Sequence, residues 1–255
     1  METSIRLNNK KVDIGNLMLN YNYYGVDDTS PTVILEAGYG MGSEVWGDLV
    51  SELSTIVNVL VYDRAGIGKS EAGTKPHHSK QVVENLKTLL QIEEIKPPYL
   101  LVGHSIGGIH IRQFAYTYPE LVSGLILVDS AHEDQNDLMV PHFSDDVQEM
   151  YYGQFVVEGG LADFNSSLNQ VRSARRPLKD LPVHVLSAGV KDDYHSEKTY
   201  QIWMRLQDDL LSLSNNTKQV IAKKSNHFIQ NHEPKLIVNS VRDILDQIRE
   251  EGANE

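Results

Sequence analysis

The feature that most constrains this chain is a serine placed between an apolar run and a helical pattern. Residues 99–102 form the apolar run, and the sequence continues as GHSIG with Ser105 at its centre. A G-x-S-x-G pattern between a strand and a helix is typical of a nucleophile elbow, a sharp turn that exposes a serine hydroxyl. Such a turn strains the serine backbone, and side chains two positions before or after it would collide with the neighbouring strand or helix. The pattern predicts that Ser105 is a nucleophile.

Segments of strand type and helix type alternate along most of the chain. Short apolar runs predict strands at residues 31–35, 57–62, 99–102, 125–128, 181–186 and 219–222, after a hairpin of two short strands within residues 11–24. Apolar residues at helical spacing predict helices at residues 43–53, 79–95, 109–115, 203–213 and 234–248. Strands that are apolar throughout and alternate with helices predict a parallel sheet covered on both faces.

The alternation stops between residues 132 and 179, where the sequence is polar and acidic with scattered aromatic residues. We expect no strand there. An interruption of this size in a sheet-forming chain is typical of a lid over the open end of the sheet. We therefore predict one α/β core made of residues 1–131 and 180–255, with residues 132–179 inserted as a lid.

The composition excludes several other classes of protein. Apolar residues make up 40% of the chain and charged residues 23%, which is typical of a globular protein with a large core. The net charge of −12 argues against nucleic acid and anionic membrane surfaces as partners. The start of the sequence has no apolar stretch of signal-peptide length, and no run is long enough to span a membrane. We expect a cytoplasmic protein that binds neither nucleic acid nor membranes.

Four segments resemble the signatures of the α/β-hydrolase superfamily and occur in the order expected for it: LEAGYG, YDRAGIGKS, GHSIGG and SNHFIQ. The resemblance extends over nearly the whole chain. The segment LVDSAHEDQ and the closing helix are also similar to a subgroup of bacterial hydrolases and carboxylesterases. The resemblance implies the α/β-hydrolase fold, a mostly parallel twisted sheet of about eight strands with helices on both faces and a short helical lid.

The resemblance also implies a triad, in which a histidine activates Ser105 and an acid orients that histidine. The histidine stands near the chain end in this architecture, and His227 has that position just after the last predicted strand. Two aspartates, Asp129 and Asp192, follow strands at positions where the superfamily places its acid. We favour Asp129, which directly follows its strand and precedes small residues, and we keep Asp192 as the alternative.

Two backbone amides form the oxyanion hole in this superfamily. By resemblance the donors are Ile106, the residue after the nucleophile, and Tyr39, in the loop after the first parallel strand. Ala37 departs from the pattern because the family usually has a histidine there, but the amide of Tyr39 does not depend on that side chain. Arg64 in YDRAGIGKS is interpreted as part of the scaffold, with binding of a substrate carboxylate as the alternative.

These features together predict a serine hydrolase that cleaves a small or medium carboxylic ester through an acyl-enzyme. The reaction needs no organic cofactor, and no histidine pair has metal-ligand spacing such as H-E-x-x-H, so we expect no metal. The same triad on the same fold also serves the hydrolysis of amides, lactones, thioesters and carbon–carbon bonds, and these alternatives stay open. A weakly catalytic receptor for a small molecule is the alternative from another class.

Overall fold

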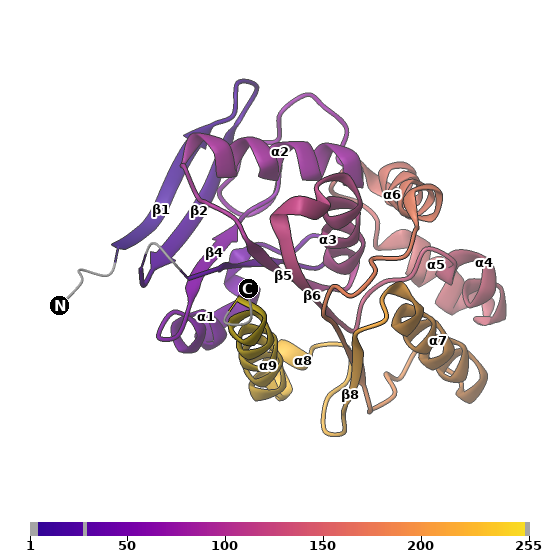
Figure 1. Ribbon diagram of the computed structural model, residues 1–255. Helices are drawn as coiled ribbons and strands as arrows, with labels where there is room; N and C mark the ends of the chain where they lie inside the picture. The colour runs from indigo at the N-terminus through magenta and orange to yellow at the C-terminus, as the bar shows by residue number, and fades with distance from the viewer. Residues whose placement is uncertain (1–4, 28–29, 253–255) are drawn as a thin grey trace.

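The computed structural model describes residues 5–27 and 30–252, and its centre is an eight-stranded sheet (Figure 1). The strands are β1 (Ile5–Asp13), β2 (Met18–Gly25), β3 (Thr32–Glu36), β4 (Asn58–Tyr62), β5 (Tyr99–His104), β6 (Val122–Val128), β7 (Val183–Ala188) and β8 (Thr217–Ala222). Their order across the sheet is β1-β2-β4-β3-β5-β6-β7-β8. Strand β2 is antiparallel to both β1 and β4, and all other neighbours are parallel. The predicted N-terminal hairpin and the mostly parallel sheet of about eight strands are confirmed.

Helices cover both faces of the sheet, as predicted. The α-helices are α1 (Gly47–Leu53), α2 (Ser79–Ile92), α3 (Ile106–Thr117), α4 (Gln135–Leu138), α5 (Asp145–Gly153), α6 (Gly160–Ala174), α7 (Glu197–Asp209), α8 (Ile229–His232) and α9 (Pro234–Gly252). Short 3₁₀ helices are η1 (Ser43–Trp46), η2 (Pro119–Leu121), η3 (Val140–His142) and η4 (Leu210–Leu213). Figure 1 shows α2 and α3 on one side of the sheet and α1 and α9 on the other. None of the helices in the described ranges is long and apolar enough to cross a membrane.

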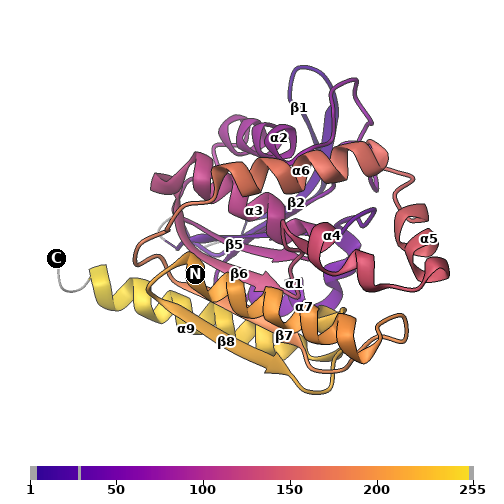
Figure 2. The same ribbon diagram turned by 90° about the vertical axis from the view of Figure 1, so that its right-hand side faces the viewer.

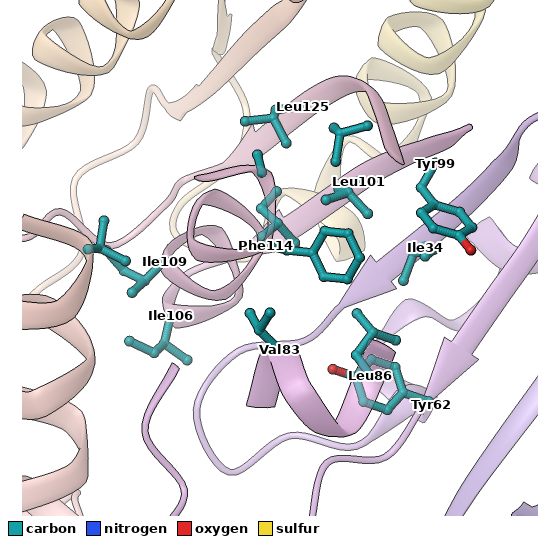
Figure 3. Close-up of a cluster of buried hydrophobic side chains, with 14 of the residues drawn as sticks. Ile34, Tyr62, Val83, Leu86, Tyr99, Leu101, Ile106, Ile109, Phe114 and Leu125 are labelled. Carbon is teal, nitrogen blue, oxygen red and sulfur yellow. The ribbon is translucent and has the colours of Figure 1, made fainter. Parts of the chain in front are cut away.

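The strands contribute side chains to two separate apolar layers. Ile34 of β3 belongs to the layer that α2 and α3 cover, whereas Val33 and Leu35 belong to the layer that α1 and α9 cover. Successive side chains of a strand point to opposite faces, so a central strand covered on both sides must be apolar at every position. Figure 3 shows the first layer, where Phe114 of α3 lies among side chains from the strands and from α2.

The parallel strands end at one edge of the sheet, and the candidate residues follow these ends. Ser105 follows β5, Asp129 follows β6, and His227 lies in the loop after β8. The segment between β6 and β7, residues 132–179, contains α4, η3, α5 and α6, and no strand is assigned within it. We call this segment the β6–β7 insert. Figure 2 shows its helices on the flank of the molecule where α7 also lies.

Helix α2 ends three residues earlier than the apolar spacing predicts, at Ile92 rather than at residue 95. Glu94 adopts a left-handed backbone with φ 53°, and the amide of Ile95 donates a hydrogen bond of 3.0 Å to the carbonyl of Leu90. This is the geometry that closes a helix at its C-terminus. Ile95 stays buried next to the helix end, which explains why the apolar pattern extends past the last helical residue.

Several histidines are buried in the core, and His110 of α3 is one of them. Its Nδ1 atom lies 2.8 Å from the hydroxyl of Ser79 at the start of α2. Burial, together with the nearby positive charge of Arg64, lowers the pKa of His110 well below its usual value. Burial likewise lowers the pKa of His184 to about 4. These imidazoles are therefore neutral in the folded protein at neutral pH.

Replacing His110 with glutamine should make the stability of the protein less sensitive to acid. Below a pH of about 6.5 the unfolded chain binds a proton at this histidine and the folded chain does not, so the free energy of unfolding falls as the pH falls. The slope of that free energy between pH 6 and pH 5 should decrease by about 1 kcal/mol per pH unit in His110→Gln. Urea unfolding at both pH values measures it, with the exposed histidine variant His142→Gln as control. An unchanged slope would contradict a neutral His110.

Candidate active site

Ser105 lies in a strained turn between β5 and α3. Its backbone has φ 54° and ψ −123°. A positive φ is uncommon for a residue that carries a side chain. The turn is held at the end of β6, because the Ser105 amide donates to the carbonyl of Val128 at 3.1 Å and the Ser105 carbonyl accepts from the amide of Ala131 at 2.9 Å. Backbone strain of this kind persists where the surroundings fix it, typically at functional sites.

The glycines around Ser105 leave no space for side chains. A Cβ atom added at Gly103 would lie 2.5 Å from the carbonyl of Gly107, and one added at Gly107 would lie 2.2 Å from the carbonyl oxygen of Glu36. One added at Gly108 would lie 2.0 Å from the hydroxyl oxygen of Ser130. The predicted collision two positions before and after the serine is therefore confirmed, and the turn packs β3, β5, β6 and α3 against one another.

His227 and Asp129 meet through a short hydrogen bond between their side chains. Nδ1 of His227 lies 2.7 Å from Oδ2 of Asp129, although the two residues are 98 positions apart. The other carboxylate oxygen, Oδ1, accepts from the amide of Ala188 at 2.9 Å and from the indole N–H of Trp203 at 3.1 Å. Asp129 is only 2% exposed. Its carboxylate is therefore satisfied on both oxygens in a buried place.

The charge state of Asp129 follows from these contacts. Burial alone raises the pKa of its carboxyl group, but the hydrogen bond and charge attraction of His227, helped by Ala188 and Trp203, outweigh that effect. The pKa of Asp129 is lower than its usual value. The carboxylate is ionised at neutral pH and accepts, so Nδ1 of His227 carries the proton and Nε2 is left free to accept one.

Asp192 lies near the same histidine but contacts a different part of it. Its Oδ2 accepts from the backbone amide of His227 at the long distance of 3.4 Å, and its side chain lines the cavity described below. The structure therefore brings Asp129, and not Asp192, to the imidazole ring. The two aspartates follow adjacent strands, β6 and β7, and Trp203 of α7 is the neighbour that distinguishes them.

The two residues expected to supply the oxyanion-hole amides are Ile106, directly after Ser105, and Tyr39, three residues after the end of β3. Ile106 is the first residue of α3, so its N–H has no partner within the helix. Tyr39 lies in the loop of residues 37–42 after β3, which we call the β3 loop. Within residues 5–27 and 30–252, neither of these two N–H groups donates to a protein acceptor.

His104, the residue before the serine, was not identified from the sequence as part of the site. It is fully buried, its Nε2 donates to the backbone carbonyl of His227 at 2.9 Å, and its Nδ1 accepts from the amide of Gln230 at 3.3 Å. Burial and the neighbouring His227 lower the pKa of His104 to about 3. As a neutral imidazole it supports the loop that carries His227. The histidine inside GHSIG was the available signal for this contact.

Arg64 supports loops and is not open to a substrate. Its guanidinium is 3% exposed and contacts the carboxylates of Glu36 at 2.7 Å and Glu158 at 2.6 Å. The alternative in which Arg64 binds a substrate carboxylate is therefore wrong, because protein groups already occupy it. The adjacent Asp63 accepts from the amides of Ser43 at 2.7 Å and Lys69 at 3.0 Å. Asp63 and Arg64 therefore hold different loops in place.

A cavity of about 340 Å³ lies above the serine. Ser105, His227 and Asp192 line it together with apolar side chains. Much of the wall is aromatic, from Tyr39, Tyr151, Phe155, Phe164, Tyr194, Trp203 and Phe228. The β6–β7 insert supplies Tyr151, Phe155 and Phe164, so it forms part of the wall of the cavity that Ser105 lines.

Comparison with known proteins places this arrangement in a family. A sequence model of the alpha/beta hydrolase fold matches residues 31–250 of the chain. The chain belongs to the α/β-hydrolase family. This α/β-hydrolase is 32% identical over 214 residues to the uncharacterized protein YqjL of Bacillus subtilis, an alignment that covers 84% of this chain and 83% of that protein. The predicted family is confirmed.

Solved structures share the fold of this α/β-hydrolase at low sequence identity. Cfl2 from Burkholderia cenocepacia has a TM-score of 0.70 and 19% identity, covering 95% of this chain and 100% of its own. A thermophilic esterase from Thermogutta terrifontis has a TM-score of 0.65 and 17% identity, covering 96% of this chain and 99% of its own. At such identities the similarity is one of fold, and function must be argued from the site.

Proposed function

We propose that this α/β-hydrolase is a serine hydrolase that cleaves carboxylic esters, with Ser105, His227 and Asp129 as its triad. The observation that supports this most strongly is the 2.7 Å hydrogen bond between His227 and Asp129 beside a cavity that Ser105 also lines. A serine hydroxyl is a weak nucleophile unless a base removes its proton, and the base needs a fixed orientation. The three residues come from three separate strand ends and supply these parts.

In the proposed reaction Oγ of Ser105 attacks the acyl carbon while Nε2 of His227 takes the hydroxyl proton. The tetrahedral intermediate collapses, the bond to the alcohol oxygen breaks, and the imidazolium returns its proton to the leaving alcohol. A water molecule, deprotonated by the same Nε2, then attacks the acyl-enzyme, releases the carboxylic acid and restores Ser105. Asp129 stays ionised throughout, keeps the proton on Nδ1 and stabilises the imidazolium.

The negative oxygen of the tetrahedral intermediate needs donors that are already in place. The free N–H groups of Ile106 and Tyr39 are suited to this role, because a donor without a protein acceptor needs no rearrangement when charge develops. Ile106 also opens α3, so the positive end of the helix dipole points toward the same oxygen. The chemistry requires no metal ion and no organic cofactor.

The cavity supports a neutral, apolar ester of small or medium size as the substrate. Its wall is mainly aromatic and aliphatic, and apolar groups gain by transfer from water into such a place. No lysine or arginine of the described chain lines it, and Asp192 is the acidic side chain there. A substrate with its own carboxylate would therefore find no positive side chain in the cavity and would be repelled by the charge of Asp192. We place this chemistry in the cytoplasm.

Replacing Ser105 with alanine should abolish ester hydrolysis. Loss of the nucleophile in a triad enzyme lowers kcat by at least about a thousandfold. The measurement is the hydrolysis of p-nitrophenyl esters from acetate to decanoate by wild type and Ser105→Ala, with the exposed helix variant Ser173→Ala as control. A folded wild type that hydrolyses none of these esters would contradict esterase activity and favour a receptor that binds a small molecule.

Asparagine substitutions should separate the two candidate acids. Asp129→Asn removes the charge that fixes the His227 tautomer, so we expect kcat to fall by roughly a thousandfold or more with little change in KM. Asp192→Asn is the matched comparison, since the hydrogen bond of its carboxylate in the described chain is to the backbone amide of His227 and not to the ring, and kcat should fall far less than in Asp129→Asn. A larger loss of kcat in Asp192→Asn than in Asp129→Asn would reverse the assignment.

A further inference from the structure

A glutamate of the β6–β7 insert reaches into the core beside the β3 loop. The carboxylate of Glu158 accepts two hydrogen bonds from Arg64, at 2.6 Å from Nε and at 3.1 Å from Nη2. The Glu158 side chain is 7% exposed and that of Arg64 is 3% exposed, so the pair is buried. Residues 64 and 158 are 94 positions apart, and this contact joins the insert to the core.

Arg64 uses its remaining donors on the backbone of the β3 loop. Nη1 donates to the carbonyl of Ala37 at 2.8 Å, and Nη2 donates to the carbonyl of Gly38 at 2.7 Å. The carbonyl of Gly38 and the N–H of Tyr39 belong to the same planar peptide unit and point in opposite directions. The Gly38 carbonyl also accepts from the amide of Met41 at 3.2 Å. Together with Met41, Arg64 therefore helps to set the direction of the Tyr39 N–H, one of the two proposed oxyanion donors.

Glu158 and its neighbour hold the other side of Tyr39. The amide of Gly40 donates to Oε2 of Glu158 at 2.8 Å. The Tyr39 hydroxyl donates to the carbonyl of Val157 and accepts from the amide of Val157 at 3.1 Å. Thus the peptide groups before and after Tyr39 are each fixed, one through Arg64 and one directly by Glu158.

The backbone at Glu158 is unfavourable for a residue with a side chain. Glu158 has φ 47°, and the two following glycines have φ 74° and 68°. Glycine adopts this left-handed region readily and glutamate does not. Glutamate therefore occupies this position against its backbone preference, and the hydrogen bonds of its carboxylate compensate for that cost. Glu36 is the other carboxyl group on Arg64, at 2.7 Å, and burial raises its pKa.

We propose that Glu158 is a positioning residue that couples the β6–β7 insert to the proposed oxyanion hole. When the insert covers the cavity, Glu158 completes the hydrogen bonds of Arg64 and Gly40, and the Tyr39 amide points at the reacting carbonyl. When the insert moves away, the β3 loop loses the hydrogen bond from Gly40 to Glu158, and Arg64 loses the carboxylate that orients its guanidinium toward the Gly38 carbonyl. The Tyr39 amide is then no longer held toward the reacting carbonyl. This inference rests on the proposed function, because it assigns a catalytic purpose to the Tyr39 amide.

The test compares Glu158→Gln with Glu149→Gln, a substitution at an exposed glutamate of the same insert. The readouts are kcat and KM for p-nitrophenyl butyrate and the inhibition constant of a trifluoromethyl ketone, which forms a tetrahedral adduct on a serine. We expect Glu158→Gln to lower kcat roughly 10–100-fold and to weaken the ketone by a similar factor, with KM changed by less than about threefold. Glu149→Gln should match wild type in all three.

A purely structural anchor gives a different result. If Glu158→Gln lowers the melting temperature but leaves kcat and ketone binding unchanged below it, the proposal is wrong. Both Glu158→Gln and Glu158→Ala remove the charge of Glu158, but the alanine variant also removes the acceptor oxygen for Arg64 and Gly40 and can fail to fold. The comparison therefore uses the glutamine variant.

Hydrogen exchange of residues 37–42 separates this inference from the proposed function, because it needs no turnover. Faster exchange of these amides in Glu158→Gln than in Glu149→Gln supports the coupling. Unchanged exchange overturns the coupling whether or not the enzyme is active. A wild type that hydrolyses no ester overturns the catalytic purpose together with the proposed function.

Discussion

The close packing of the turn at Ser105 is the constraint on which the rest of the site depends. β3, β5, β6 and α3 approach one another so closely that Gly103, Gly107 and Gly108 cannot carry a side chain. The approach places the serine hydroxyl, the Ile106 amide and the β3 loop around one point at the edge of the sheet. Every other functional group has to reach that point from a different strand end, which is why the candidate residues are widely separated in sequence.

Two buried polar systems bring those groups together from opposite sides. On one side Asp129, with Trp203 and the amide of Ala188, holds the ring of His227. On the other side Arg64 and Glu158 hold the β3 loop. Buried charges are costly unless they are paired or hydrogen-bonded, and in both systems the charged groups are hydrogen-bonded to protein partners. Each therefore restrains a loop that carries a group of the proposed site.

Local patterns in the sequence predicted the central strands and the turn at Ser105, because the residue types within each of these segments determine its structure. Central strands covered on both faces must be apolar throughout, so apolar runs in the sequence predicted them. The glycines around Ser105 predicted the turn that carries it. The choice between Asp129 and Asp192 was not readable, since both follow strands and the contacts of Ala188 and Trp203 distinguish them in space. The contact between Arg64 and Glu158 depends on how the insert folds back over the sheet, and no local pattern encodes that.

The most direct test of the central claim is to locate the covalent adduct of a fluorophosphonate by peptide mass spectrometry. If Ser105 is a nucleophile activated by His227, the wild-type protein will gain one phosphonyl group, and the modified peptide will be the one that contains Ser105. The adduct will form far more slowly in Asp129→Asn, because the base is no longer held in the required tautomer. A folded protein that gains no adduct, or gains it at another residue, would contradict the account.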